Sequence, residues 1–174
     1  MDLEDASAVL RRGLDQLAGL LDDLPGQRSS VPTPCEQWDL QQLVDHIVAA
    51  PARFARMARG ESVDWSATPS SGPEPAARFR TGADDLLLAV RDAGDGSVPV
   101  DWQCAEVAVH TWDLATSLGK STADLDPAVA ERGLAFMRGN LTEGNRGPAF
   151  GPERAAPEGA DAYRRIAAFA GRSV

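Results

Sequence analysis

The segment DWQCAEVAVHTWD, residues 101–113, carries the strongest structural and chemical signal in this sequence. It is expected to form a helix, and it places Glu106 and His110 four residues apart. Side chains at that spacing leave the same face of a helix, about 6 Å from each other. One helix therefore presents a carboxylate and an imidazole side by side.

The chain contains two histidines, and the second, His46, lies in another apolar-patterned stretch at residues 40–48. Two imidazoles and one carboxylate from two helices form a three-ligand metal site with an open position, as in catalytic zinc sites. These ligands suit zinc, and nickel, iron or manganese less specifically. The residues therefore indicate a metal site formed by His46, Glu106 and His110.

The same residues also have interpretations that need no metal. A Glu-x-x-x-His pair often occurs by chance on a helix, and His46 can be a hydrogen-bonded core histidine. A serine or cysteine triad fits less well, because no recognisable nucleophile motif accompanies the histidines. Asp113 lies near the same face, and it either orients a ligand imidazole or forms a salt bridge within the bundle. Asp45 is expected to face solvent.

Apolar residues recur at intervals of three or four along most of the chain, which is typical of amphipathic helices. We expect helices at residues 2–24, 40–60, 74–92, 101–119, 126–141 and 160–170. Segments rich in Pro, Gly or Ser predict loops at residues 27–38, 62–75 and 140–159. The three tryptophans expected in the core or in a pocket wall are Trp38, Trp102 and Trp112.

Several residue types mark the helix ends. Asp39 and Gln42 have the spacing of a capping box, and Pro51 predicts a kink in the same helix. The other expected boundaries are Asp101 as a cap, Asp126-Pro127 as the start of the fifth helix, and Gly94-Asp95-Gly96 as the end of the third.

No alternating strand pattern is visible, so the predicted fold class is all-α. Four long helices favour a four-helix bundle, with additional short C-terminal helices. A length of 174 residues fits a single domain, residues 1–174.

Composition excludes several functional classes. A net charge of −9 argues against a nucleic-acid partner, which needs a basic surface. No apolar run is long enough to span a membrane, and no signal-peptide pattern begins the chain. Cys35 and Cys104 form no C-x-x-C unit and are expected to be free thiols, partly buried. A cytoplasmic protein is expected.

Residues 33–40 (TPCEQWDL) and 43–48 (LVDHIV) resemble the start of the mycothiol-dependent maleylpyruvate isomerase metal-binding domain family. Residues 106–115 (EVAVHTWDLA) resemble its second histidine motif, and residues 150–152 (FGP) resemble an actinobacterial subgroup. The resemblance spans nearly the whole chain. It implies the DinB/YfiT-like superfamily of four-helix bundles.

The resemblance also implies a ligand set, because His46, Glu106 and His110 match the family's metal ligands. The metal would be zinc in most cases, with nickel as the alternative. Its open position would take water or a low-molecular-weight thiol such as mycothiol, whose pKa the metal lowers. The resemblance implies no catalytic group other than this metal-bound thiol or water.

The function implied is a metal- and thiol-dependent enzyme, either an S-transferase acting on an electrophilic substrate or a maleylpyruvate-isomerase-like enzyme. The characterised isomerase has a further C-terminal domain that contributes to its substrate site, and this chain ends soon after the bundle. Arg138 and Arg146 are either grips for an anionic substrate or surface residues. The alternatives are a non-enzymatic metal-binding or regulatory DinB-like protein and a metal-free structural bundle.

Overall fold

The computed structural model describes residues 3–94, 99–147 and 150–174. Within these ranges the chain is all-helical and contains no β-strand. The elements are α1 (Leu3–Asp22), α2 (Leu40–Ala58), α3 (Pro75–Ala93), α4 (Val100–Ser117), α5 (Ala128–Asn140), the short 3-10 helix η2 (Glu143–Asn145) and α6 (Ala162–Phe169). The fold is a DinB-like bundle with additional C-terminal helices, as predicted. None of the described helices combines the length and apolar composition needed to cross a membrane.

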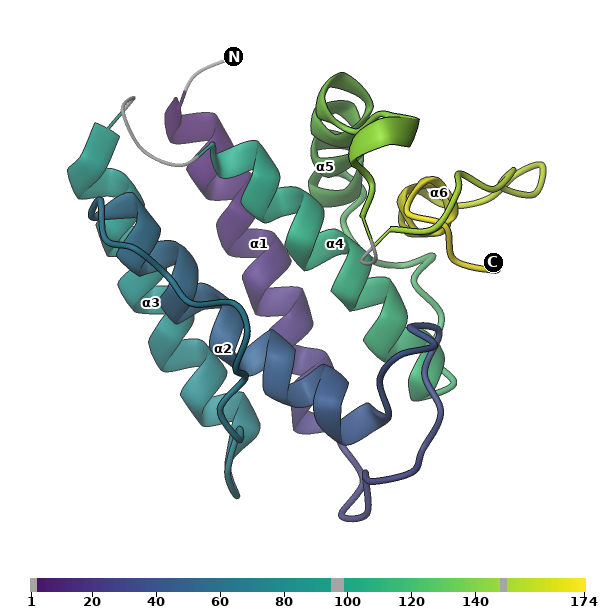
Figure 1. The fold of residues 1–174 in the computed structure, drawn as a ribbon, viewed down its shortest axis with the longest axis horizontal. Coiled ribbons are helices and arrows are strands. Elements are labelled where there is room, and N and C mark those ends of the chain that lie inside the picture. The colour runs from purple at the N-terminus through teal and green to yellow at the C-terminus, as the bar shows by residue number, and fades with distance from the viewer. Residues whose placement is uncertain (1–2, 95–98, 148–149) are drawn as a thin grey trace.

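Helices α1 to α4 form the bundle itself (Figure 1). The pair α1 and α4 runs through the middle of the molecule, with α2 and α3 packed together on one side of it. Helix α3 contacts α1, and α2 contacts α4, which closes the ring of four. Helices α5 and α6 lie on the other side of α4 and contact each other. Helix α4 therefore touches both the bundle and the C-terminal helices.

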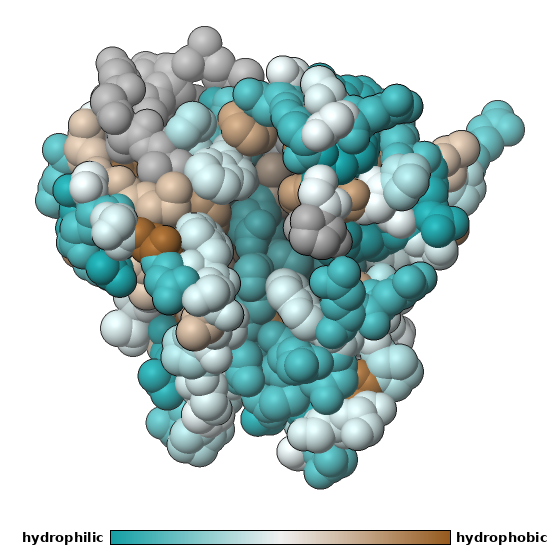
Figure 2. All heavy atoms as spheres, viewed as in Figure 1, coloured by the Kyte–Doolittle hydropathy of each residue, from teal (hydrophilic) through white to brown (hydrophobic). Residues whose placement is uncertain are grey.

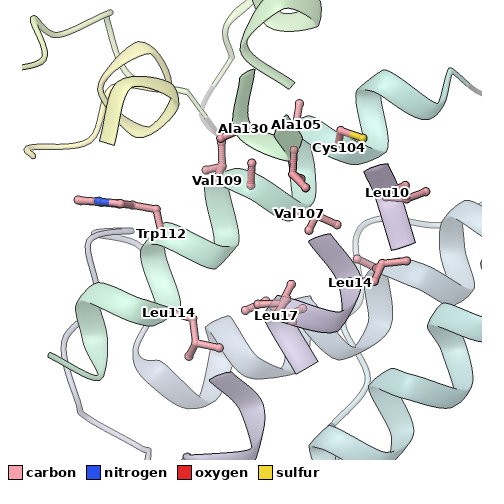
Figure 3. Close-up of a cluster of buried hydrophobic side chains, with 14 of the residues drawn as sticks. Leu10, Leu14, Leu17, Cys104, Ala105, Val107, Val109, Trp112, Leu114 and Ala130 are labelled. Atoms are coloured by element: carbon pink, nitrogen blue, oxygen red, sulfur yellow. The ribbon is translucent and has the colours of Figure 1, made fainter. Parts of the chain in front are cut away.

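The core follows the apolar stripe predicted for the first helix. Leu10, Leu14 and Leu17 are at most 2% exposed, and they lie beside Val107 of α4 (Figure 3). Burying each such side chain contributes roughly 1.5–3 kcal/mol. Helix α4 is buried on almost all sides from Cys104 to Ala115, apart from a partly exposed Glu106. That near-complete burial fixes the positions of its polar side chains.

Helix α5 approaches α4 unusually closely at a glycine. A Cβ atom added to Gly133 would lie 2.6 Å from the Cα of Ala105, so only glycine fits there. Ala105 precedes Glu106 in the chain. The close contact between α5 and α4 therefore lies next to Glu106, the first of the two candidate metal ligands on α4.

Most predicted helix boundaries agree with the structure to within two residues. The capping box of Asp39 and Gln42 is confirmed in both directions. Helix α2 continues through Pro51 to Ala58. Helix α3 ends at Ala93, and the predicted Gly-Asp-Gly stop at 94–96 lies mostly outside the described residues.

The predicted cap at Asp101 is wrong. Helix α4 begins one residue earlier, at Val100, directly after Pro99, so Asp101 already lies inside the first turn. Its carboxylate forms an ion pair with Arg132 of α5 instead. A smaller difference occurs at α5, which begins at Ala128 with Pro127 as its N-cap residue, while the Asp126 carboxylate accepts a hydrogen bond from the Ala128 amide.

Candidate metal centre

Three potential metal ligands converge between α2 and α4. His46 projects from α2, and Glu106 and His110 project from α4 one turn apart. His46 Nε2 donates a hydrogen bond to Glu106 Oε1 over 2.6 Å, and His110 Nε2 lies 3.3 Å from the same oxygen. One ligand atom from each of the three side chains lies within 4.8 Å of the others. We call these residues the triad.

The donor set of the triad fits a divalent metal. Two imidazole nitrogens and one carboxylate oxygen are the ligands of catalytic zinc sites with an open position. Their separation is close enough for one ion after small side-chain movements. The side chains are only 9–19% exposed, so the surrounding protein holds them in place. The triad can therefore offer three ligand atoms to a single ion.

Charge in the triad shifts the pKa values of Glu106 and His110 in opposite directions. Burial raises the pKa of Glu106, but the two imidazoles outweigh burial and bring this pKa well below its usual value. Burial lowers the pKa of His110, but the carboxylates of Glu106 and Asp113 outweigh it and raise this pKa to about 9. Metal binding at neutral pH therefore has to displace a proton from His110.

Asp113 lies directly behind His110. His110 Nδ1 donates to Asp113 Oδ2 over 3.1 Å, which leaves Nε2 directed at Glu106. The carboxylate of Asp113 is fully buried and also accepts hydrogen bonds from Arg172 Nε at 3.2 Å and from Arg172 Nη2 at 3.0 Å. Asp113 therefore combines both roles considered for it, since it holds an imidazole and forms a buried ion pair.

An indole ring packs against both imidazoles. Trp38, at the end of the loop before α2, has its ring centroid 4.6 Å from that of His46 and 6.0 Å from that of His110. Its backbone carbonyl accepts a hydrogen bond from the Thr33 hydroxyl at 2.7 Å, which secures the loop. Trp38 therefore forms a wall of the site, which is one of the two positions predicted for it, the core or a pocket wall.

The two other tryptophans predicted for the core or a pocket wall differ from each other. Trp112 is buried in the core. Trp102 is 37% exposed, and its ring meets Phe54 edge-on at 5.4 Å. Trp65, from the loop after α2, meets the same phenylalanine at 5.7 Å and is also exposed. Phe54 therefore lies between two surface tryptophans.

A small apolar cavity adjoins the triad inside the bundle. Its apolar wall comes from four helices and includes Leu14 and Leu17 of α1, Ile47 and Phe54 of α2, Phe79 and Leu86 of α3, and Val107 of α4. Its polar residues all come from α4, and they are Gln103, Glu106 and His110. The free volume is about 20 Å³, enough for one water molecule. We call this space the inner cavity.

The prediction that Asp45 faces solvent is wrong. Its carboxylate instead holds the loop after α2 against that helix. Asp45 Oδ1 accepts hydrogen bonds from Ser71 N at 2.8 Å, from Ser71 Oγ at 2.6 Å and from Gln41 Nε2 at 2.8 Å. Ser71 is only 1% exposed. The residue next to His46 thus ties a loop 26 positions away to α2.

The face shown in Figure 2 is hollowed near its centre, and hydrophilic residues lie at the bottom of the hollow.

The remaining candidate residues lie outside the triad. Both cysteines are free. Cys104 is fully buried rather than partly buried, and burial raises its pKa to about 12. Burial also raises the pKa of Cys35. Arg146 donates to the backbone oxygens of Gly151 and Phe169, and Arg138 is exposed, so neither lines the inner cavity.

Two site residues were missed in the sequence. Arg172 stands alone near the C-terminus, and no spacing relates it to the histidine motifs. Gln103 belongs to the opening segment; it is 1% exposed, and its side-chain nitrogen and oxygen have no hydrogen-bond partner among the residues that the structure describes. Only the helical register hinted at Gln103, which precedes Glu106 by three positions and so shares its face.

Comparison with known proteins matches the part of the chain that contains the triad. The family model described as the mycothiol maleylpyruvate isomerase N-terminal domain matches residues 10–115, a range that contains the whole triad and Asp113 but not Arg172. Two uncharacterised proteins of Mycobacterium tuberculosis, from strains CDC 1551 and H37Rv, are each 30% identical to the chain over 190 aligned positions. Each alignment covers 94% of this chain and 96% of the relative. No solved structure is significantly similar to the chain. The chain belongs to the mycothiol maleylpyruvate isomerase N-terminal domain family.

Proposed function

We propose that this protein is a metal-dependent enzyme that uses a low-molecular-weight thiol of the mycothiol type, with the metal held by His46, Glu106 and His110. The observation that carries the proposal is the convergence of these three side chains from two helices, within 4.8 Å of one another. The family description, which names mycothiol, supports the choice of thiol. Zinc is the proposed metal because the donor set matches catalytic zinc sites, and nickel is the alternative.

When bound, the metal would supply Lewis acidity that lowers the pKa of a coordinated thiol. The side chains of the protein have supporting roles. Asp113 accepts the Nδ1 proton of His110 and so directs Nε2 toward Glu106. Trp38 packs on both imidazoles and limits the access of water to them. The inner cavity adjoins the triad and offers space for part of a substrate.

S-transfer to an electrophile and isomerisation both fit this arrangement. Each begins with attack by the thiol sulfur, and they differ in whether the sulfur stays attached to the product. Neither cysteine of the chain replaces the external thiol, because burial raises both cysteine pKa values. The nucleophile is therefore assigned to the cofactor.

The test begins with elemental analysis of protein purified without a chelator or an affinity metal. We expect about one zinc or nickel ion per chain in the wild type, and none in His46→Ala or His110→Ala, because two remaining ligands bind too weakly. The loaded protein is then mixed with mycothiol and monochlorobimane, an electrophile whose thioether fluoresces. No metal in the wild type after zinc addition and dialysis would refute the proposal. Metal without any thiol-dependent reaction would favour a metal-binding protein without catalysis.

A further inference from the structure

The polar residues of the inner cavity lie on one stripe of α4. Gln103, Glu106 and His110 follow one another at spacings of three and four, so their side chains leave the same face. Glu106 and His110 belong to the triad. Gln103 lies about one turn before Glu106, toward the N-terminus of α4, and lines the inner cavity together with apolar side chains.

The amide of Gln103 has hydrogen-bonding capacity that the protein does not use. The residue is 1% exposed, and within the described part of the chain neither its side-chain nitrogen nor its oxygen has a hydrogen-bond partner. A buried amide without partners destabilises a folded protein, and such groups are rare. A neutral group on a ligand that can donate and accept hydrogen bonds would satisfy both atoms.

The charge of the inner cavity narrows the choice of ligand. None of the described residues that line it is an arginine or a lysine. Its ionisable residues, Glu106 and His110, are engaged with each other and with His46. An anionic group placed beside Gln103 would therefore lose its hydration, and the one lining side chain that can carry positive charge among the described residues, His110, is already paired with Glu106.

We propose that the inner cavity binds the uncharged, mainly apolar body of the electrophilic substrate, and that Gln103 selects a neutral hydrogen-bonding group on it, such as a carboxamide. This inference rests on the proposed function, because it places the substrate beside the triad. It also excludes from this cavity the carboxylates of a dicarboxylate such as maleylpyruvate. The site therefore favours S-transfer to a neutral electrophile over isomerisation of a dianion.

Entry of such a group requires the inner cavity to widen, since its free volume is about 20 Å³. The structure offers a place for this movement at Phe54. Its ring forms part of the apolar wall and touches the exposed rings of Trp65 and Trp102 on its outer side. Displacement of Phe54 would connect Gln103 with the surface.

The test uses cobalt(II)-loaded protein and three thiols that place the sulfur and a short tail in one molecule. The probes are 3-mercaptopropanamide, 3-methylbutane-1-thiol and 3-mercaptopropanoate, which carry a neutral amide, an apolar group and a carboxylate on the same two-carbon link. Thiolate-to-cobalt absorption reports the dissociation constant of each. In the wild type we expect the amide to bind at least tenfold more tightly than the carboxylate.

In Gln103→Leu we expect the affinity for the amide to fall about tenfold, in line with the loss of hydrogen bonds, while the apolar thiol binds as well or better. Gln27→Leu is the matched control, because Gln27 is exposed in the loop after α1. Equal binding of amide and carboxylate by the wild type, or an unchanged amide preference in Gln103→Leu, would overturn the assignment of Gln103. In both cases the absorption band itself would leave the proposed function intact. If no thiol produced the band on cobalt-loaded protein, the proposed function would fail, and this inference would fail with it.

Discussion

Arg172 and Asp113 form a buried, two-bonded ion pair that links the C-terminal segment to the triad. Arg172 Nε and Nη2 each lie within 3.2 Å of an oxygen of the Asp113 carboxylate. The side chain of Arg172 is 8% exposed and that of Asp113 is 0% exposed. Burial raises the pKa of Asp113, but His110 and Arg172 outweigh burial and lower it, so the carboxylate stays ionised. His110 thus depends on a residue that lies 62 positions later in the sequence.

The first prediction concerns this dependence. Replacing Arg172 with Gln should weaken zinc binding by roughly tenfold or more, because partners of ligand residues commonly contribute 10- to 100-fold to metal affinity. Arg172→Lys should retain part of the affinity, since one charged donor remains. Competition with a chromophoric chelator measures the affinity directly. Arg154→Gln is the control, because exposed Arg154 also bonds the C-terminal segment, through the Gly171 carbonyl.

Loss of Arg172 also breaks a buried ion pair and leaves Asp113 with His110 alone as its charged partner, and breaking such a pair commonly costs about 3–5 kcal/mol of stability. Zinc affinity must therefore be compared at temperatures where near-ultraviolet circular dichroism shows both variants folded. Unchanged zinc affinity in folded Arg172→Gln would mean that the ion pair stabilises the fold without positioning His110.

The second prediction is that zinc binding strengthens as pH rises. Because the pKa of His110 is raised to about 9, this imidazole holds a proton at neutral pH and must release it to bind metal. The apparent association constant should rise about tenfold per pH unit from pH 7 and level off near pH 9. Asp113→Asn removes one of the groups that raise this pKa, so its curve should level off at a lower pH. Superimposable curves for the two proteins would contradict the assignment.

The third prediction concerns the loop after α2. Asp45→Ala removes three hydrogen bonds to Asp45 Oδ1, two of them from nearly buried Ser71, and should lower the free energy of unfolding by about 2 kcal/mol. Protease cleavage within residues 61–74 should accelerate. Asp64→Ala is closely matched, because Asp64 bonds the amide and hydroxyl of Ser66 at 2.8 and 2.6 Å in an exposed turn. Urea denaturation should show a much smaller effect of that control, and equal effects would rule out a special role for Asp45.

Sequence reasoning located the parts of the site that follow from local periodicity. The spacing of Glu106 and His110 places them on one helical face. His46 followed from being the other of two histidines, in a second apolar-patterned stretch, and from the family resemblance. Arg172 could not be predicted in this way, because its contact with Asp113 depends on how the C-terminal segment packs against α4. The contact between Asp45 and Ser71 is similarly set by the path of a loop. From its position in the sequence, Asp45 was therefore predicted to be exposed.

The last prediction separates stability from function at Gln103. Leucine has a similar size but no polar atoms, so Gln103→Leu removes two unpaired buried groups and places an apolar side chain among apolar neighbours. The metal-free variant should therefore be more stable than the wild type by about 1–2 kcal/mol. Urea denaturation with EDTA present, followed by tryptophan fluorescence, measures the difference.

Gln103→Ala should instead be less stable, because it leaves a larger cavity. A residue that lowers the stability of the free protein is expected where it is needed for binding. If Gln103→Leu were destabilised, the amide would have to be well paired in solution, and it would then have no hydrogen bonds to offer a substrate.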